Sequence, residues 1–181
     1  CVDMHDIVGR QEIIKQVVAA AVRGLGIDQG IGRWCVVATG INVLVQIQLD
    51  AANAADLIRP YDLVLDGSDN FDTRYLVNDT CVALGKPLVS GAAIRMDGQV
   101  SVFDSTQTQA PCYACIFPPE QAPEETRCAT LGVFAPLVGI IGTVQAAEAL
   151  KILSGMGSHM AGRLLMLDGR ELSWTDIRMQ R

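Results

Sequence analysis

The spacing of hydrophobic positions predicts that strands and helices alternate from about residue 51 onward. The runs typical of strands are 62–65, 88–90 and 99–103, and the segments typical of helices are 51–58 and 70–84. This alternation predicts an α/β fold with a mainly parallel sheet and helices on both faces. Residues 163–167 and 172–178 then predict a closing antiparallel pair of strands toward the C-terminus.

Three other segments have less regular patterns. Residues 96–98 predict a turn between the strands 88–90 and 99–103. Residues 104–130 are too long for an ordinary connection, which predicts either a functional loop or a disordered one. Residues 133–153 predict a helix with one apolar face, broken near Pro136 and Gly139.

The first fifty residues give two interpretations. Residues 12–22 have a helical composition, residues 34–37 and 43–49 are β-like, and glycines 24, 26, 30 and 32 lie between them. A phosphate-binding glycine loop must leave a strand and open a helix, whereas these glycines follow a predicted helix and lead into a strand. An ordinary connection from helix to strand is therefore the favoured interpretation.

Composition and charge narrow the class of protein. The chain has 181 residues, half of them hydrophobic, which predicts one domain over residues 1–181. A net charge of -6 argues against nucleic acid or an anionic membrane as partner. The apolar stretch 131–144 is interrupted and short for a membrane span, so it predicts buried core. No signal segment is apparent, so the six cysteines are expected to be thiols or metal ligands and not disulfides. The expected location is the cytoplasm.

The candidate chemistry lies where the strand 62–65 ends. Ligands of parallel sheets bind outside the carboxyl ends of the strands, and Asp66, Asp69 and Asn70 fall there. One interpretation is structural: Ser68 or Asp69 caps the next helix, which accounts for one polar residue at this position. The other is functional: the cluster of carboxylates binds Mg²⁺, which is shared with the phosphates of a substrate. Arg74, one turn into the helix, either neutralises the carboxylates or contacts the ligand.

Several motifs in order resemble the ThiF/MoeB family, the bacterial relatives of ubiquitin-activating enzymes. The match runs from about residue 48 to 178 and rests on residues 62–70, 73–74, 78, 86–92, 98–99, 111–115, 139–142, 145–146 and 148–149. The resemblance implies a Rossmann-like fold and Mg²⁺-dependent transfer of adenylate from ATP to the C-terminal glycine of a ubiquitin-like sulfur carrier. It places Asp69 on the family's metal-binding aspartate and Asn70 on its neighbour at the nucleotide.

The resemblance also assigns roles to cysteines. Cys112 and Cys115 form a CxxC, which in relatives is half of a tetrahedral zinc site, and the second pair does not occur before residue 181. The alternative is a reduced or disulfide-linked turn. Cys128 falls at the family's loop cysteine, where Arg127 and the following helix start favour a reactive thiolate. Cys128 is therefore either a catalytic thiol or a thiol that merely lies in a loop.

The N-terminal part, about residues 1–47, is atypical or incomplete for this family because it has no GxGGxG. Asp3 falls at a position that resembles the end of the family's ribose-binding strand. Arg10 falls either on the arginine of the family's Arg-Gln pair at ATP or on the arginine that reaches a partner subunit's ATP. Residues 30–37 also resemble the run into the ribose strand, and these alignments exclude one another. Lys15 matches the phosphate lysine only if intervening residues are missing.

Two functions from different classes remain open on the sequence. One is a homodimeric adenylyltransferase that acts on a ThiS- or MoaD-like carrier ending in Gly-Gly, in thiamin or molybdopterin biosynthesis. The other is a non-catalytic family member or partner subunit that binds a carrier without making adenylate, and the missing glycine loop motivates it.

Overall fold

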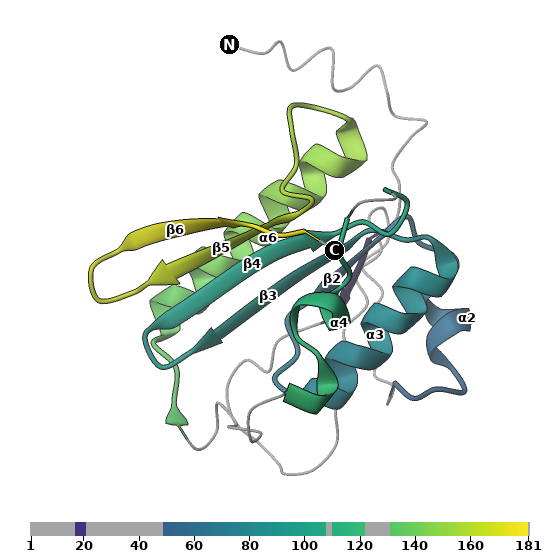
Figure 1. Ribbon diagram of the computed structural model, residues 1–181, viewed down its shortest axis with the longest axis horizontal. Helices are drawn as coiled ribbons and strands as arrows, with labels where there is room; N and C mark the ends of the chain where they lie inside the picture. The colour runs from purple at the N-terminus through teal and green to yellow at the C-terminus, as the bar shows by residue number, and fades with distance from the viewer. Residues whose placement is uncertain (1–16, 21–48, 108–109, 122–130, 181) are drawn as a thin grey trace.

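A six-stranded sheet forms the centre of the protein (Figure 1). The computed structural model describes residues 17–20, 49–107, 110–121 and 131–180. The strands are β1 (Val17–Ala20), β2 (Leu63–Asp66), β3 (Leu88–Ile94), β4 (Asp97–Phe103), β5 (Arg163–Asp168) and β6 (Ser173–Arg178), and they lie side by side in chain order. The predicted α/β class and the strands near 62–65, 88–90, 99–103, 163–167 and 172–178 are confirmed.

The sheet is parallel in its first half and antiparallel in its second. β1 pairs with β2 and β2 with β3 in parallel, whereas the pairs β3–β4, β4–β5 and β5–β6 are antiparallel. Within the described residues the antiparallel strands expected toward the C-terminus are thus confirmed, and they follow parallel strands in the first half of the sheet. The connections from β3 to β4 and from β5 to β6 are short, which favours antiparallel neighbours, whereas β5 pairs with β4 after the long segment 104–162.

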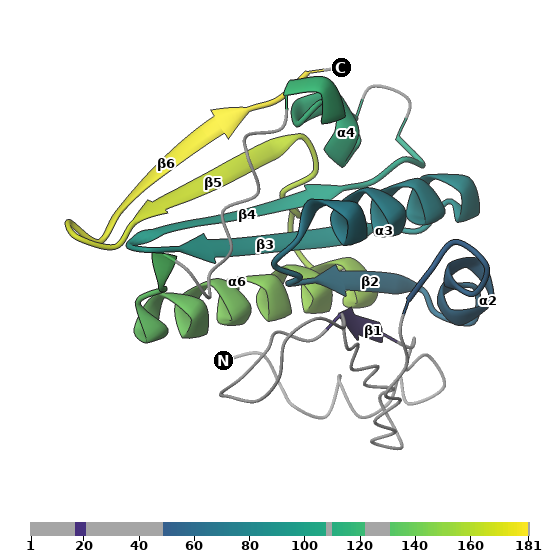
Figure 2. The same ribbon diagram turned by 90° about the horizontal axis from the view of Figure 1, so that it is seen from below.

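Helices cover both faces of the sheet, as predicted. The helical segments are α2 (Ala54–Ile58), α3 (Phe71–Leu84), α4 (Tyr113–Ile116), the 3₁₀ turn η2 (Pro119–Gln121) and α6 (Ala135–Ser154). Figure 2 shows α3 and α4 on one side of β3 and β4, and α6 on the other. α6 packs along β3 and β4 and also reaches β2.

The central strands bury side chains on both faces because successive residues of a strand point to opposite sides. Val64 and Leu88 belong to the apolar cluster under α3 and α4, together with Val77, Phe103 and Tyr113. Their neighbours Leu63 and Val89 belong to the cluster under α6, together with Val100, Val102, Leu137, Ile141 and Leu167. Two apolar layers therefore enclose the first residues of β2 and β3.

The structure corrects three local predictions. Residues 17–20 form β1, within the segment 12–22 that has a helical composition. Helix α6 is continuous, because Pro136 lies in its first turn, where no backbone N–H donor is needed. The turn between β3 and β4 is formed by Arg95 and Met96, one residue earlier than predicted. The long segment after β4 contains α4 and η2 within its described part.

Helix α6 has one buried and one exposed side, which corrects the expectation that 131–144 is simply buried core. Leu137 and Ile141 are buried against the sheet, whereas Gly139 and Gly142 are exposed. In the part of the chain that is described, α6 is the one helix long and apolar enough to cross a membrane by length and composition, with 28% of its window buried. Core helices of globular domains pass the same test, so this is weak evidence for a span.

Candidate functional site

The candidate site lies where β2 and β3 separate. Asp66 is the last residue of β2 and is paired with Ser90 of β3. Beyond this point β3 continues to Ile94, whereas the chain after β2 turns through residues 67–70 into α3. Ligands of α/β sheets bind in the space outside such strand ends, so the fold places this loop where a ligand is expected.

Asn70 caps helix α3. Its backbone is extended (φ −136°, ψ 148°), and its Oδ1 accepts a hydrogen bond of 2.9 Å from the backbone N–H of Thr73. This corrects the expectation that Ser68 or Asp69 provides the cap. The carboxylate of Asp69 is exposed just before the helix start, where the helix dipole favours negative charge.

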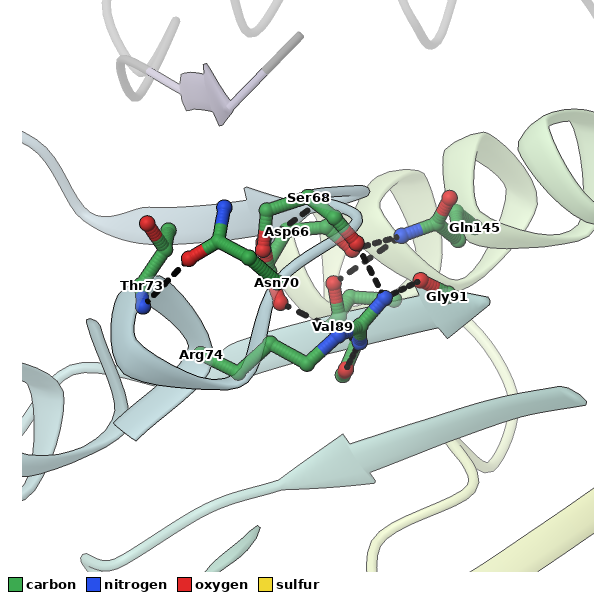
Figure 3. Close-up of polar contacts among 9 residues, drawn as sticks. Asp66, Ser68, Asn70, Thr73, Arg74, Val89, Gly91 and Gln145 are labelled. Carbon is green, nitrogen blue, oxygen red and sulfur yellow. Dashed lines mark hydrogen bonds and ion pairs between the residues drawn. The ribbon is translucent and has the colours of Figure 1, made fainter. Parts of the chain in front are cut away.

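Arg74 is buried under the loop and neutralises Asp66 (Figure 3). Its Nη1 lies 3.4 Å from Oδ2 of Asp66 and donates to the Ser90 hydroxyl at 3.2 Å. Its Nη2 donates to the backbone carbonyls of Ser68 and of Gly91, the latter at 3.1 Å. Of the two predicted roles for Arg74, the structure supports neutralisation of a carboxylate, because the guanidinium is almost fully enclosed.

Asp66 has both carboxylate oxygens engaged within the protein. Oδ1 accepts a 2.9 Å hydrogen bond from the backbone N–H of Ser68, and Oδ2 faces Arg74. Asp66 is 1% exposed, so it supports the loop and does not line the open site. The aspartates around the end of β2 therefore divide into a buried one, Asp66, and exposed ones, Asp69 and Asp72.

Gln145 reaches the same strand ends from α6, on the opposite face of the sheet (Figure 3). Its Nε2 donates to the backbone carbonyl of Asp66 at 2.9 Å and to that of Val89 at 3.1 Å. The residue is 8% exposed. No role was predicted for Gln145, Ser90 or Gly91, although a glutamine in the middle of an apolar helix is a signal that it meets buried polar groups.

The donor set allows Mg²⁺ with one protein carboxylate. Among the described residues, no group of three or more His, Cys, Asp and Glu could hold a metal ion. Mg²⁺ commonly uses one or two carboxylates together with water and substrate phosphates, so the exposed carboxylate of Asp69 fits this mode and not a closed protein cage.

Cys112 and Cys115 come together at the start of α4. Their Sγ atoms are 3.1 Å apart, which is a contact between thiols and not a disulfide. The backbone N–H of Tyr113, between them, donates to Oδ1 of the buried Asn78 at 2.8 Å, so α3 fixes this turn. Burial, followed by the hydrogen bond with Cys115, raises the pKa of Cys112. A tetrahedral zinc site takes four such ligands, so these two thiols alone do not complete one.

The remaining predicted site residues lie outside the described part of the chain. They are Asp3, Arg10, Lys15 and Cys128. Within the described part, the structure brings Asp69 and Asn70 together on one loop and holds Cys112 and Cys115 together on another.

The sequence model of the ThiF family matches residues 33–181. The adenylyltransferase and sulfurtransferase MOCS3 of Drosophila grimshawi is 50% identical over 133 residues, which are 73% of this chain and 29% of the relative. The sulfur carrier protein adenylyltransferase of Thermus thermophilus is 47% identical over 150 residues, which are 78% of this chain and 55% of the relative. The chain thus spans 29% of the length of the first relative and 55% of the length of the second.

Solved structures show the same fold at low identity. A crystal structure of E. coli MccB with ATP has a TM-score of 0.59 and 15% identity, over 75% of this chain and 42% of that chain. A crystal structure of PaaA has a TM-score of 0.54 and 10% identity, over 73% of this chain and 39% of that chain. Identities this low show the fold alone, and the fold they show is the Rossmann-like one expected from the sequence.

Proposed function

This chain belongs to the ThiF family, and from that premise we propose that it forms the core of an enzyme that adenylates a small ubiquitin-like sulfur carrier. A carboxylate oxygen of the carrier's C-terminal glycine attacks the α-phosphorus of ATP. The bond from that phosphorus to the pyrophosphate oxygen breaks, and pyrophosphate leaves with the bonding electrons. The products are an acyl adenylate and pyrophosphate, and the step needs no oxidant or reductant.

The observation that carries the proposal is the exposed Asp69 on a loop anchored at the end of β2. A lone carboxylate facing a triphosphate is unfavourable unless a cation lies between them, so we assign Asp69 as a ligand of Mg²⁺. When bound, the ion offsets negative charge on the departing pyrophosphate. Asn70 uses Oδ1 for the helix cap, which leaves its Nδ2 to donate a hydrogen bond to the nucleotide.

The residues predicted at the triphosphate and in loop chemistry remain part of the proposal. Arg10 and Lys15 would supply positive charge for the phosphates, Asp3 would hold the ribose, and Cys128 would take part in loop chemistry. Cys112 and Cys115 would supply two of four zinc ligands, the others coming from outside the described residues. We also propose that the protein is a homodimer and that it is located in the cytoplasm. Size-exclusion chromatography with light scattering tests the oligomeric state.

The experiment that tests the function is carrier-dependent ATP–pyrophosphate exchange by the full-length protein. Purified ThiS-like and MoaD-like carriers from the same organism are compared, each with a matched variant that lacks the final glycine. We expect exchange with one intact carrier and none with its truncated form, which also separates the thiamin from the molybdopterin pathway. Carrier binding without exchange and without ATP binding would instead support a non-catalytic partner subunit.

A further inference from the structure

The end of β2 needs hydrogen-bond donors that the sheet itself does not supply. The parallel pairing of β2 with β3 stops at Asp66 and Ser90, while β3 continues to Ile94. Backbone carbonyls at such a divergence are buried, and a buried carbonyl without a partner is costly. The side-chain amide of Gln145 fills this need by donating to the carbonyls of both Asp66 and Val89.

Arg74 supplies donors to the same point from the other face of the sheet. It contacts the Asp66 carboxylate, the Ser90 hydroxyl and the backbone carbonyls of Ser68 and Gly91. Asp66 is thus held through its carboxylate by α3 and through its backbone carbonyl by α6. Figure 3 shows the two side chains converging on the strand ends from α3 and from α6.

The fit of Gln145 depends on the absence of a side chain at Gly91. A Cβ atom on Gly91 would lie 2.4 Å from Cδ and 2.5 Å from Oε1 of Gln145, closer than such atoms approach in folded proteins. The amide therefore rests against bare backbone of β3. This arrangement leaves Gln145 little freedom, which is what a side chain that fixes other groups requires.

We propose that Arg74 and Gln145 are positioning residues that hold Asp69 in place for Mg²⁺ and ATP. They fix Asp66 and Ser68 at the start of the loop, and the cap of Asn70 on Thr73 fixes its end. Asp69 lies between these anchored residues, so its backbone direction is set before any ligand arrives. Neither Arg74 nor Gln145 is exposed enough to touch a ligand, so both act through the loop.

The test is Mn²⁺ binding in the presence of ATP, measured by electron paramagnetic resonance with the full-length protein. This inference rests on the proposed function, and the wild type separates the two: no Mn²⁺–ATP binding by the wild type overturns the proposed function itself. The variants are Gln145→Leu, which removes the donors, and Arg74→Lys, which keeps the charge but loses the two-pronged contact. We expect each to weaken Mn²⁺ binding by about 10–100-fold, the usual effect of losing a residue that orients a metal ligand.

The matched control is Glu148→Ala, three residues further along α6. Glu148 is also buried, but its Oε2 accepts a 2.9 Å hydrogen bond from the backbone N–H of Met160, away from the loop. We expect this variant to lower the melting temperature without changing Mn²⁺ affinity. Folded Gln145→Leu and Arg74→Lys proteins with wild-type Mn²⁺ affinity would overturn the positioning role.

Hydrogen exchange of the wild type keeps the inference testable if both variants fail to fold. Without nucleotide or metal, we expect the amide of Ser68, bonded to Asp66, to exchange as slowly as amides of β2 and β3. Fast exchange of Ser68 that slows only when ATP and Mn²⁺ are added would show that the ligand orders the loop, and it would overturn the proposal.

Discussion

Arg74 and Asp66 form a buried ion pair at the end of β2, with Nη1 3.4 Å from Oδ2 and the side chains 7% and 1% exposed. Breaking a buried pair leaves an uncompensated charge, so Arg74→Ala should lower the free energy of unfolding by about 3–5 kcal/mol. Urea unfolding followed by circular dichroism measures the loss. The control is Arg59→Ala, which removes an exposed pair with Asp56 and should cost at most about 1 kcal/mol. Equal losses in the two variants would contradict the prediction.

Gly91 and Gln145 should be energetically coupled. Gly91→Ala should destabilise the protein by about 1–3 kcal/mol, because its Cβ meets the Gln145 amide and the overlap must be relieved. In the double variant Gly91→Ala with Gln145→Ala the steric cost disappears, so the two effects should be less than additive. A double-mutant cycle from thermal unfolding measures the coupling.

Gly139→Ala is the matched control for this cycle. Gly139 lies within α6, and a Cβ there would meet nothing within 4 Å. Alanine in an open helical position should stabilise the protein by about 0.5–1 kcal/mol, the opposite sign to Gly91→Ala. The same sign for both substitutions would argue against the close approach of Gln145 to Gly91.

Much of the fold follows from local patterns, because β2 begins as a short apolar run after a helix and α3 has clear ends. Asn70 caps its start, and Gly85, in the left-handed conformation (φ 62°), ends it. β1 escaped prediction because Val17–Ala20 has no local strand signal strong enough to oppose its helical surroundings. Its strand conformation comes from pairing with β2, more than 40 residues away along the chain.

The candidate site was predictable only where it is local in sequence. Asp69 and Asn70 follow a strand and precede a helix, which is enough to place them at the sheet edge. Gln145 is 79 residues from Asp66, and only the packing of α6 brings its amide to that carbonyl. The reason Arg74 cannot contact a ligand is likewise its burial, which depends on Ser90 and Gly91 of the next strand.

The cysteines should differ in reactivity according to burial. Desolvation of the Cys81 thiol, together with the nearby charge of Asp66, raises its pKa to about 12. The thiolate is the form that alkylates, so in protein stripped of metal by a chelator Cys81 should remain unmodified by iodoacetamide at neutral pH while the exposed Cys115 reacts. Peptide mass spectrometry before and after unfolding in urea checks this. Modification of Cys81 in the native protein at the rate of Cys115 would contradict its burial.

Asp104 should contribute a pH-dependent part of the stability. Burial raises the pKa of its carboxyl, but hydrogen bonds from Thr106 and Gln107 and the nearby His159 outweigh burial, so the pKa falls below the usual 3.8. A carboxyl whose folded pKa is lowered stabilises the protein above its unfolded pKa, and this contribution disappears as pH falls through the folded pKa. The difference in unfolding free energy between wild type and Asp104→Ala should therefore shrink from about pH 7 to about pH 3. A difference that grows on acidification would contradict the lowered pKa.

The measurement that tests the proposed adenylation most directly is ATP–pyrophosphate exchange by Asp69→Asn, beside the control Asp72→Asn. Both aspartates are exposed and three residues apart, so both variants should fold like the wild type. With an intact carrier ending in Gly-Gly, we predict that Asp69→Asn loses exchange by about 100-fold or more, because the Mg²⁺ that would offset charge on the departing pyrophosphate loses its proposed protein ligand. Asp72→Asn should exchange at the wild-type rate. Undiminished exchange by Asp69→Asn would contradict the proposed role of Asp69 at the phosphates.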